Sequence, residues 1–396
     1  MKSAIRTPVL MYHTTGRPLP GWLWSGLTTP MGLFQRQVDL LAKHGYVSIS
    51  LDDLRERQES GTAGLAKEVV LTFDDGYLDN WVVAFPILKK LGWQGTIYVN
   101  TDFVDPGEEV RLNLEDVWAG RCTLDDLLLD GFLNRAELRA LQASGVMTIA
   151  FHSRTHTWYP TSGKVVDYHR PGLETPWLAW NTCPDRKFAY LTENQAEFVP
   201  WGTPILEHGR SLGIRRFIPD PSFASPFQDR VRGEGGPAFF ARPGWRRMLD
   251  DLVGGDGKAP GRLESGEEMR ERFRDELLAG KEELEVVVGD SVRHFCWPGG
   301  SYCDESWEVA DGAGFDTICV SRRDPRRWAQ EDDPRLVRRI GSLDKVASWR
   351  GLYPTGDERF LLWACEIERG ATWKTWPFRF MKLVTAARNG FSPLKT

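Results

Sequence analysis

Several features that would assign a protein to a broad class are missing from this chain of 396 residues. No apolar run approaches the roughly 18 residues of a membrane-spanning helix. The six cysteines form no C-x-x-C pair, so neither a disulfide framework nor a thiolate zinc site is indicated. The formal net charge of −5 argues against a nucleic-acid-binding protein. The first residues lack the apolar segment of a signal peptide, so we expect a cytoplasmic location.

Apolar and aromatic residues are plentiful instead. Apolar residues make up 41% of the chain and charged residues 27%, which is typical of a folded globular protein. The 17 tryptophans have two explanations, because flat aromatic rings pack well in cores and also stack on sugar rings. Composition alone does not choose between them.

Strand-like and helix-like segments alternate along the first 150 residues. The apolar patterns predict strands at 8–13, 46–50, 69–73, 95–100 and 146–151, and helices at 34–44, 80–91 and 134–143. Further strands are expected at 294–297 and 315–320, with a helix at 305–312 between them. Such alternation predicts a parallel sheet, or a barrel with helices outside.

A segment of different composition interrupts this alternation. Residues from about 157 to 290 are rich in Gly, Pro, Trp and Arg, and we expect helices within them at 205–212 and 267–284. We therefore predict a barrel over residues 1–345 that contains an insertion at about 157–290. Residues 346–396 are expected to form a C-terminal extension.

Two adjacent carboxylates, Asp74 and Asp75, follow the apolar run at 69–73, and Gly76 comes next. Active sites of parallel α/β folds lie at the carboxyl ends of strands. Neighbouring buried carboxylates repel each other, so we expect a cation nearby. A polar turn at the start of the next helix would explain Asp-Asp-Gly equally well.

A pair of histidines follows a second predicted strand. His152 and His156 are four residues apart, so a helical turn would present both imidazoles on one side. Together with one Asp they supply three metal ligands and leave a coordination position open, as in hydrolytic metal sites. The second carboxylate is then free to act as a general base.

The chain contains four short motifs in order: PVLMYH at 8–13, TFDDG at 72–76, HSRTH at 152–156 and FCWPGGSY at 295–302. Together they resemble the polysaccharide deacetylase (NodB-homology) family. The first and last resemble the branch that includes poly-N-acetylglucosamine deacetylases. The resemblance implies an α/β fold, namely a distorted (β/α) barrel of the NodB-homology type, here with a long insertion. It also implies a metal-dependent carbohydrate N-deacetylase that acts on an amino-sugar-containing glycan or its precursor.

The resemblance assigns roles to five residues. Asp74 is the expected base, and Asp75, His152 and His156 are the expected ligands of one divalent metal ion. Zinc is the expected metal, with cobalt, nickel and iron as alternatives. His13 is the candidate general acid, because the late histidine that many members use is absent.

The last motif supplies the expected substrate contacts. The backbone N–H near Gly299 would hold the oxyanion, and Trp297 and Tyr302 would line the groove. Core packing explains Trp297 equally well. Many members have an arginine in this motif that pairs with the base, whereas this chain has Cys296 there.

Two other functions stay open at this point. The same family resemblance extends to hydrolases of formamido sugars on lipid carriers, so the substrate is either an N-acetylated glycan or a lipid-linked saccharide. A non-catalytic carbohydrate-binding protein on a degenerate barrel is the third hypothesis. The complete set of two aspartates and two histidines argues against it.

The C-terminal tail suggests a membrane surface as a further partner. Residues 369–396 include six Lys or Arg and no Asp or Glu, with Trp373, Trp376 and Phe380 among them. Aromatic residues favour the lipid headgroup region, and cations are attracted to an anionic leaflet. Pro377 is expected to interrupt a helix there. We therefore hypothesise peripheral contact with the inner membrane face, with packing of these aromatics on the barrel as the alternative.

Overall fold

The structure is a computed structural model that describes residues 5–18, 25–255, 257–321, 333–348 and 351–388. Its contacts divide the chain into two compact units. The first comprises Met1–His152, Glu283–Gly300 and Gly314–Thr396, and the second comprises Ser153–Glu282 and Ser301–Ala313. The second unit overlaps the expected insertion, whereas the expected extension at 346–396 groups with the first unit.

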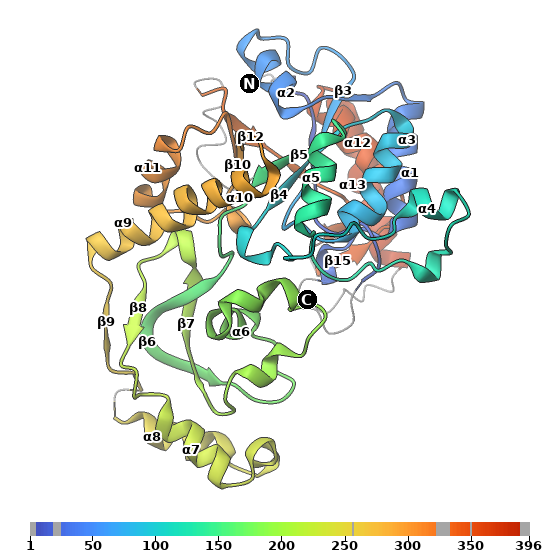
Figure 1. Ribbon diagram of the computed structural model, residues 1–396. Coiled ribbons are helices and arrows are strands. Elements are labelled where there is room, and N and C mark those ends of the chain that lie inside the picture. Colours follow the sequence, from blue (N-terminus) through green and yellow to red (C-terminus); the bar gives the residue numbers. More distant parts are fainter. Residues whose placement is uncertain (1–4, 19–24, 256, 322–332, 349–350, 389–396) are drawn as a thin grey trace. The chain divides into compact units, whose positions relative to one another are not determined.

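Parallel strands form the centre of the first unit, in the order β12-β11-β10-β5-β4-β3-β1-β13 (Figure 1). Their bounds are β1 (Val9–Tyr12), β3 (Glu68–Phe73), β4 (Gly95–Val99), β5 (Met147–Phe151), β10 (His294–Cys296), β11 (Thr317–Val320), β12 (Leu336–Arg338) and β13 (Ile340–Gly341). Although β12 and β13 stand at opposite ends of this order, only Arg339 separates them along the chain. One short segment therefore closes the sheet, and the predicted distorted (β/α) barrel is confirmed.

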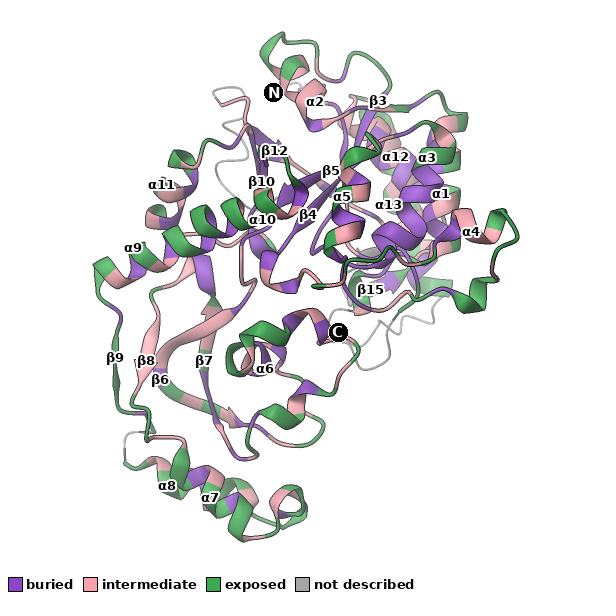
Figure 2. Cartoon of the chain, in the orientation of Figure 1, coloured by how far each residue is buried: buried purple, intermediate pink, exposed green. Residues whose placement is uncertain are grey.

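The barrel strands are apolar because both of their faces are covered. Every residue of β3 and β4 is buried, and Figure 2 shows these strands in the colour of buried residues. Strands β1 and β3 pair in register from Val9↔Val70 to Tyr12↔Phe73. The short strand β2 (Val47–Ser48) pairs with β3 outside this path.

Helices alternate with these strands, as the sequence predicts. Their bounds are α1 (Met31–Lys43), α2 (Leu51–Glu59), a π-helical turn η2 (Asn80–Ala84), α3 (Phe85–Leu91), α4 (Leu114–Trp118) and α5 (Arg135–Ala143). Asn134 caps α5, because its side chain accepts from the N–H of Glu137 at 2.8 Å. The carboxylate of Glu137 accepts from the N–H of Asn134 in return, which completes a capping box.

The C-terminal part of the first unit contains a hairpin and two helices. The hairpin joins β14 (Lys345–Ser348) to β15 (Gly351–Pro354), and α12 (Arg359–Glu368) and α13 (Thr375–Arg388) follow. The predicted interruption of the helix at Pro377 is wrong. Pro377 lies in the first turn of α13, where the missing N–H has no intrahelical partner to lose. Among the described residues, no helix is both long and apolar enough to span a bilayer.

The second unit contains antiparallel strands and further helices. The strands β6 (Trp158–Tyr168) and β7 (Pro204–Arg210) pair, as do β8 (Phe217–Pro219) and β9 (Gly261–Leu263). The helix predicted at 205–212 is therefore wrong, because hydrogen bonds to β6 hold most of this segment extended. The helices are α6 (Pro176–Thr182), α7 (Ser225–Gly233), α8 (Trp245–Val253) and α11 (Asp304–Gly312). The helix expected at 267–284 is present as α9 (Gly266–Arg274), a π-helical turn η9 (Asp275–Ala279) and α10 (Gly280–Val288).

Candidate active site

The carboxyl ends of three barrel strands present the predicted polar residues of the first unit. His13 follows β1, Asp74 and Asp75 follow β3, and His152 follows β5. Because parallel strands end on the same side of a barrel, these side chains gather at one end of it. The site therefore lies where active sites of such barrels are found.

The backbone after β3 turns sharply at Asp75. Its φ of 74° and the φ of 69° at Gly76 are both left-handed. Few residues other than glycine adopt this conformation, and those that do gather at functional sites. The turn gives the two adjacent carboxylates different partners, namely Arg339 for Asp74 and His152 for Asp75.

Asp74 forms a bidentate ion pair with Arg339. Nη1 lies 2.6 Å from Oδ1, and Nη2 lies 2.7 Å from Oδ2. Burial raises the pKa of Asp74, but the charges of Arg339, His152 and His13 and the hydrogen bonds from Arg339 outweigh burial and lower it. Asp74 therefore stays ionised, and Arg339 is the nearby cation that the adjacent carboxylates predict.

Arg339 is the site residue that the sequence analysis missed. Its Nη2 also lies 2.9 Å from Sγ of Cys296, and its guanidinium lies over the ring of Tyr98 at 5.5 Å. Arg339 thus pairs with the base in the way that the resemblance assigns to an arginine at the position of Cys296. One signal was available in the sequence: the segment LVRRIG places arginines in a strand-like run, and a buried arginine needs an anionic partner.

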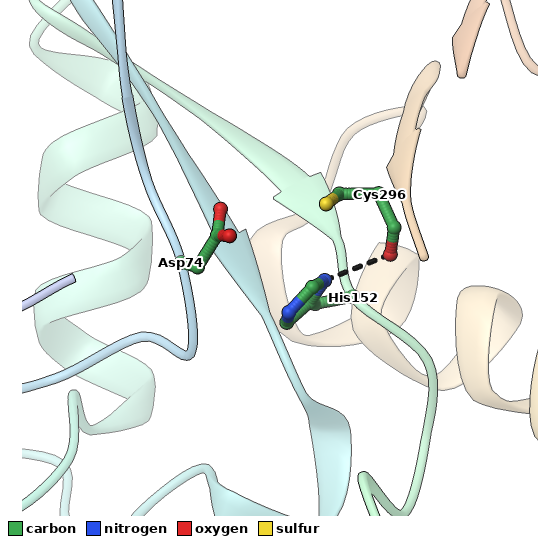
Figure 3. A group of neighbouring side chains, drawn as sticks. All are labelled: Asp74, His152 and Cys296. Carbon is green, nitrogen blue, oxygen red and sulfur yellow. Dashed lines mark hydrogen bonds between the residues drawn. The ribbon is translucent and has the colours of Figure 1, made fainter. Parts of the chain in front are cut away.

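His152 points one ring nitrogen toward Asp75. Its Nε2 lies 3.4 Å from Oδ1 of Asp75. Its Nδ1 lies 2.7 Å from the carbonyl oxygen of Cys296, as Figure 3 shows. A carbonyl only accepts hydrogen bonds, so Nδ1 donates. Nε2 carries a lone pair when the ring is neutral and donates to Asp75 when the ring is protonated. Burial lowers the pKa of His152, but the hydrogen bond to Asp75 and the charges of both carboxylates raise it further, so the pKa is raised overall.

Asp75 and His152 suit a divalent metal ion. A backbone carbonyl that orients the second ring nitrogen is the usual support of a metal-binding histidine. Ligand atoms of Asp74, His152 and Cys296 also lie within 4.8 Å of one another (Figure 3). Asp74, however, already binds Arg339 through both oxygens, and burial raises the pKa of the Cys296 thiol, which keeps it protonated. As ligands of a metal ion, Asp75 and His152 are therefore favoured over the group of Asp74, His152 and Cys296.

Residues 152–157 form an irregular loop, so the predicted helical turn is wrong. Ser153 and His156 have left-handed φ values of 75° and 46°, which a right-handed helix does not accommodate. His156 belongs to the second unit, three residues past the boundary at Ser153. Its role as a third ligand stays a prediction.

His13 lies beside the predicted base. Its Nε2 is 3.8 Å from Oδ2 of Asp74, and its side chain is 16% exposed. Its carbonyl oxygen accepts a hydrogen bond of 2.9 Å from Nδ2 of Asn80. The structure thus brings the predicted acid and base together, while the acid role itself stays a prediction.

Of the predicted substrate contacts in the last motif, Trp297 is buried and Gly299 is exposed. Trp297 is 1% exposed and packs edge-on against Phe295 at 4.7 Å, which is the core-packing alternative. Gly299 has a left-handed φ of 55° within the short turn Pro298–Gly300. Tyr302 belongs to the second unit and contacts Trp307 at 5.0 Å. The substrate contacts of Trp297, Gly299 and Tyr302 stay predictions.

Parts of this chain are similar to known polysaccharide deacetylases. The Bacillus subtilis (strain 168) protein YxkH, which is named after the polysaccharide deacetylases, is 31% identical over 94 residues, which are 24% of this chain and 32% of YxkH. The poly-beta-1,6-N-acetyl-D-glucosamine N-deacetylase of Escherichia coli (strain K12) is 27% identical over 124 residues, which are 31% of this chain and 17% of that protein. The chain thus spans well under half of either relative.

A solved structure of a de-N-acetylase from Aggregatibacter actinomycetemcomitans is similar with a TM-score of 0.49 and 16% identity, over 84% of this chain and 93% of that one. The family model described as "Polysaccharide deacetylase" matches residues 62–175. This segment includes Asp74, Asp75, His152 and His156. The chain is therefore similar to the polysaccharide deacetylase family over residues 62–175.

Proposed function

We propose that this protein is a metal-dependent hydrolase that removes N-acetyl groups from an amino-sugar-containing glycan or its precursor. The observation that supports this most directly is the arrangement after β3. There Asp74 is held ionised by Arg339, while the adjacent Asp75 meets Nε2 of His152. The family match and the named activity of the E. coli relative point to the same reaction.

The metal ligands in this proposal are Asp75, His152 and His156. One carboxylate and two imidazoles suit zinc, and also cobalt, nickel or iron. A divalent ion held there supplies Lewis acidity, which polarises an amide carbonyl and acidifies water. The remaining chemistry belongs to side chains of the chain itself.

Asp74 and His13 divide the proton transfers. Asp74 accepts a proton from the water that attacks the acetyl carbonyl carbon, because its carboxylate is ionised and buried. His13 donates a proton to the amide nitrogen as the C–N bond breaks. The products are acetate and a free amino sugar. The N–H near Gly299 donates to the developing oxyanion in this scheme.

Acetate release from N-acetylglucosamine oligosaccharides tests the proposal, together with elemental analysis of the metal. We expect one divalent ion per chain and one free amine for each acetate. Asp75→Asn should lose both metal and activity. Asp125→Asn makes the same chemical change at an exposed position outside the site and should lose neither. Absence of both metal and acetate release from the unaltered protein would refute the proposal.

The same assay separates the alternatives. Release of formate from a formamido sugar, without acetate from the acetylated one, would favour the deformylase. Activity on lipid-linked saccharides alone would place the substrate on a carrier. Saturable glycan binding without release of either acid would favour the non-catalytic binding protein.

We also propose that the C-terminal segment makes peripheral contact with an anionic membrane surface. Trp373, Trp376 and Phe380 are 68%, 77% and 64% exposed. Arg379 and Arg388 are exposed on α13, which also carries Trp376 and Phe380, and both aromatic rings and cations favour an anionic lipid surface. Residues 389–396 lie outside the described part of the chain. The expected cytoplasmic location stays a prediction.

A further inference from the structure

The backbone that follows β1 is held by two side chains from the turn after β3. The carboxylate oxygen Oδ2 of Asp79 accepts hydrogen bonds from the N–H groups of Thr15 at 2.8 Å and Gly16 at 2.7 Å. Nδ2 of Asn80 donates to the carbonyl oxygen of His13 at 2.9 Å. The same Nδ2 lies 3.1 Å from Oδ1 of Asp79, so the two side chains support each other.

These contacts are buried and tightly fitted. Asp79 is 2% exposed and Asn80 is fully buried. A Cβ added to Gly16 would lie 2.9 Å from Oδ2 of Asp79, so the close approach of this backbone requires glycine. Burial raises the pKa of Asp79 to about 7, while the hydrogen bonds from the N–H groups of Thr15 and Gly16 favour its charged form.

Backbone hydrogen bonds also fix the same segment. The N–H of Thr29 donates to the carbonyl oxygen of Thr14 at 3.0 Å, and the N–H of Met31 donates to that of Gly16 at 3.0 Å. Residues 13–16 are therefore held by residues 29–31 through their backbone and by Asp79 and Asn80 through their side chains.

His13 lies at the start of this supported segment. The register of β1 and β3 ends at the pair Tyr12↔Phe73, so His13 lies just beyond the last ladder pair. Its Nε2 is nevertheless 3.8 Å from Oδ2 of Asp74. The hydrogen bond from Asn80 to the carbonyl oxygen of His13 fixes the peptide next to this side chain.

We propose that Asp79 and Asn80 are positioning residues that hold His13 beside Asp74. This inference rests on the proposed function, in which His13 donates the proton. A single turn after β3 then supplies the base, a metal ligand and the support of the acid. A displacement of about 1 Å in a reacting group can lower turnover about 10²-fold, so loss of this support should be measurable.

A double-mutant cycle with His13 tests the inference. In the otherwise unaltered protein we expect Asn80→Ala and Asp79→Ala to lower kcat about 10²-fold and to change KM less than about threefold. In a His13→Ala background the same changes should lower kcat less than about twofold, because the group they position is gone. A purely structural role predicts the same loss in both backgrounds, and that result would overturn the inference.

Two further variants sharpen the cycle. Asp79→Asn keeps an oxygen that can accept from Thr15 and Gly16, so it should recover most of the kcat that Asp79→Ala loses. Ser50→Ala removes the N-cap of α2, a helix that contributes no residue to the site. It should lower stability without lowering kcat. If Ser50→Ala lowers kcat as much as Asp79→Ala does, general destabilisation explains both losses. That result would overturn the inference.

Amide hydrogen exchange provides a readout that does not depend on activity. We expect the amides of Thr15 and Gly16 to exchange faster in Asp79→Ala than in the unaltered protein, and to be unchanged in Ser50→Ala. If the unaltered protein releases no acyl group from any sugar, the proposed function fails, and exchange still decides whether Asp79 holds this segment. Unchanged exchange in Asp79→Ala would overturn the inference, whatever the activity.

Discussion

At the scale of single residues, Asp74 and Asp75 are neighbours in sequence whose surroundings give them different chemistry. Asp74 is paired through both oxygens with Arg339, which leaves it ionised. Asp75 faces Nε2 of His152. The left-handed φ of Asp75 lets the two side chains diverge. One carboxylate is thus suited to accept a proton and the other to bind a metal.

This division predicts different effects for two matched substitutions. Asp74→Asn should lower kcat by at least about 10²-fold, because an amide cannot act as a general base, and should leave the bound metal in place. Asp75→Asn should lose the metal as well as activity. Metal content by elemental analysis and acetate release by enzymatic assay provide the measurement. Loss of metal in Asp74→Asn at unchanged fold would reverse the two assignments.

Arg339 should set the acidic limb of the pH–rate profile. Arg339 lowers the pKa of Asp74, and the base acts only when deprotonated, so its removal should raise that pKa. We therefore expect the acidic limb of kcat/KM to move to higher pH in Arg339→Met. Arg339→Lys keeps the charge but not the bidentate geometry, so its shift should be smaller. If the acidic limb stays at the same pH in both variants, Arg339 does not control the protonation of the catalytic base.

At the scale of elements, several segments differ from the expectation of a regular helix. The segment Pro204–Arg210 is a strand because β6 provides a hydrogen-bonding partner. The loop 152–157 is irregular because Ser153 and His156 adopt left-handed conformations. Conversely, Pro377 lies inside α13, because the first turn of a helix tolerates proline.

The segment from Trp373 to the end of α13 should determine membrane attachment. Trp373→Ser and Trp376→Ser, made together, remove exposed aromatic rings and should reduce co-sedimentation with anionic vesicles at low salt. Trp118→Ser removes another exposed tryptophan, on α4, and should have no effect. High salt should also release the unaltered protein, because the attraction of cations to the lipid surface is screened. If the unaltered protein does not sediment with vesicles at low salt, the membrane proposal is wrong.

At the scale of the whole molecule, closure of the barrel assembles the site. Strands β12 and β13 join opposite ends of the sheet order, and Arg339 lies between them. Asp74 and Arg339 are far apart in sequence, so their ion pair forms only when the sheet has closed. Chemistry at the site is therefore coupled to folding of the entire barrel.

Metal binding should accordingly stabilise the whole fold. A ligand that binds only the folded state raises the free energy of unfolding by about 2.7 kcal/mol at 100 times its dissociation constant. We expect zinc to produce a stabilisation of this order in urea unfolding experiments, and Asp75→Asn to abolish it. Asp125→Asn should keep it. Equal stabilisation of Asp75→Asn and the unaltered protein would show that zinc binds elsewhere.

The sequence by itself determined most barrel elements and the positions of the polar residues that follow them. The apolar runs before Asp74 and His152 are local patterns, and their alternation with helices required a parallel arrangement. The capping box at Asn134 and Glu137 was likewise local, since both partners lie within one helical turn. Local patterns are sufficient here because each is set by residues that are close together in the chain.

Only the tertiary structure decided which of these residues act together. In the structure Arg339 forms an ion pair with Asp74, and His13 lies next to Asp74. Asp79 and Asn80 form hydrogen bonds with the segment 13–16. It also buried Trp297, for which the sequence allowed either packing or sugar stacking. These contacts join residues that are distant in sequence. They depend on strand register and on closure of the sheet, and the local pattern of a single segment determines neither.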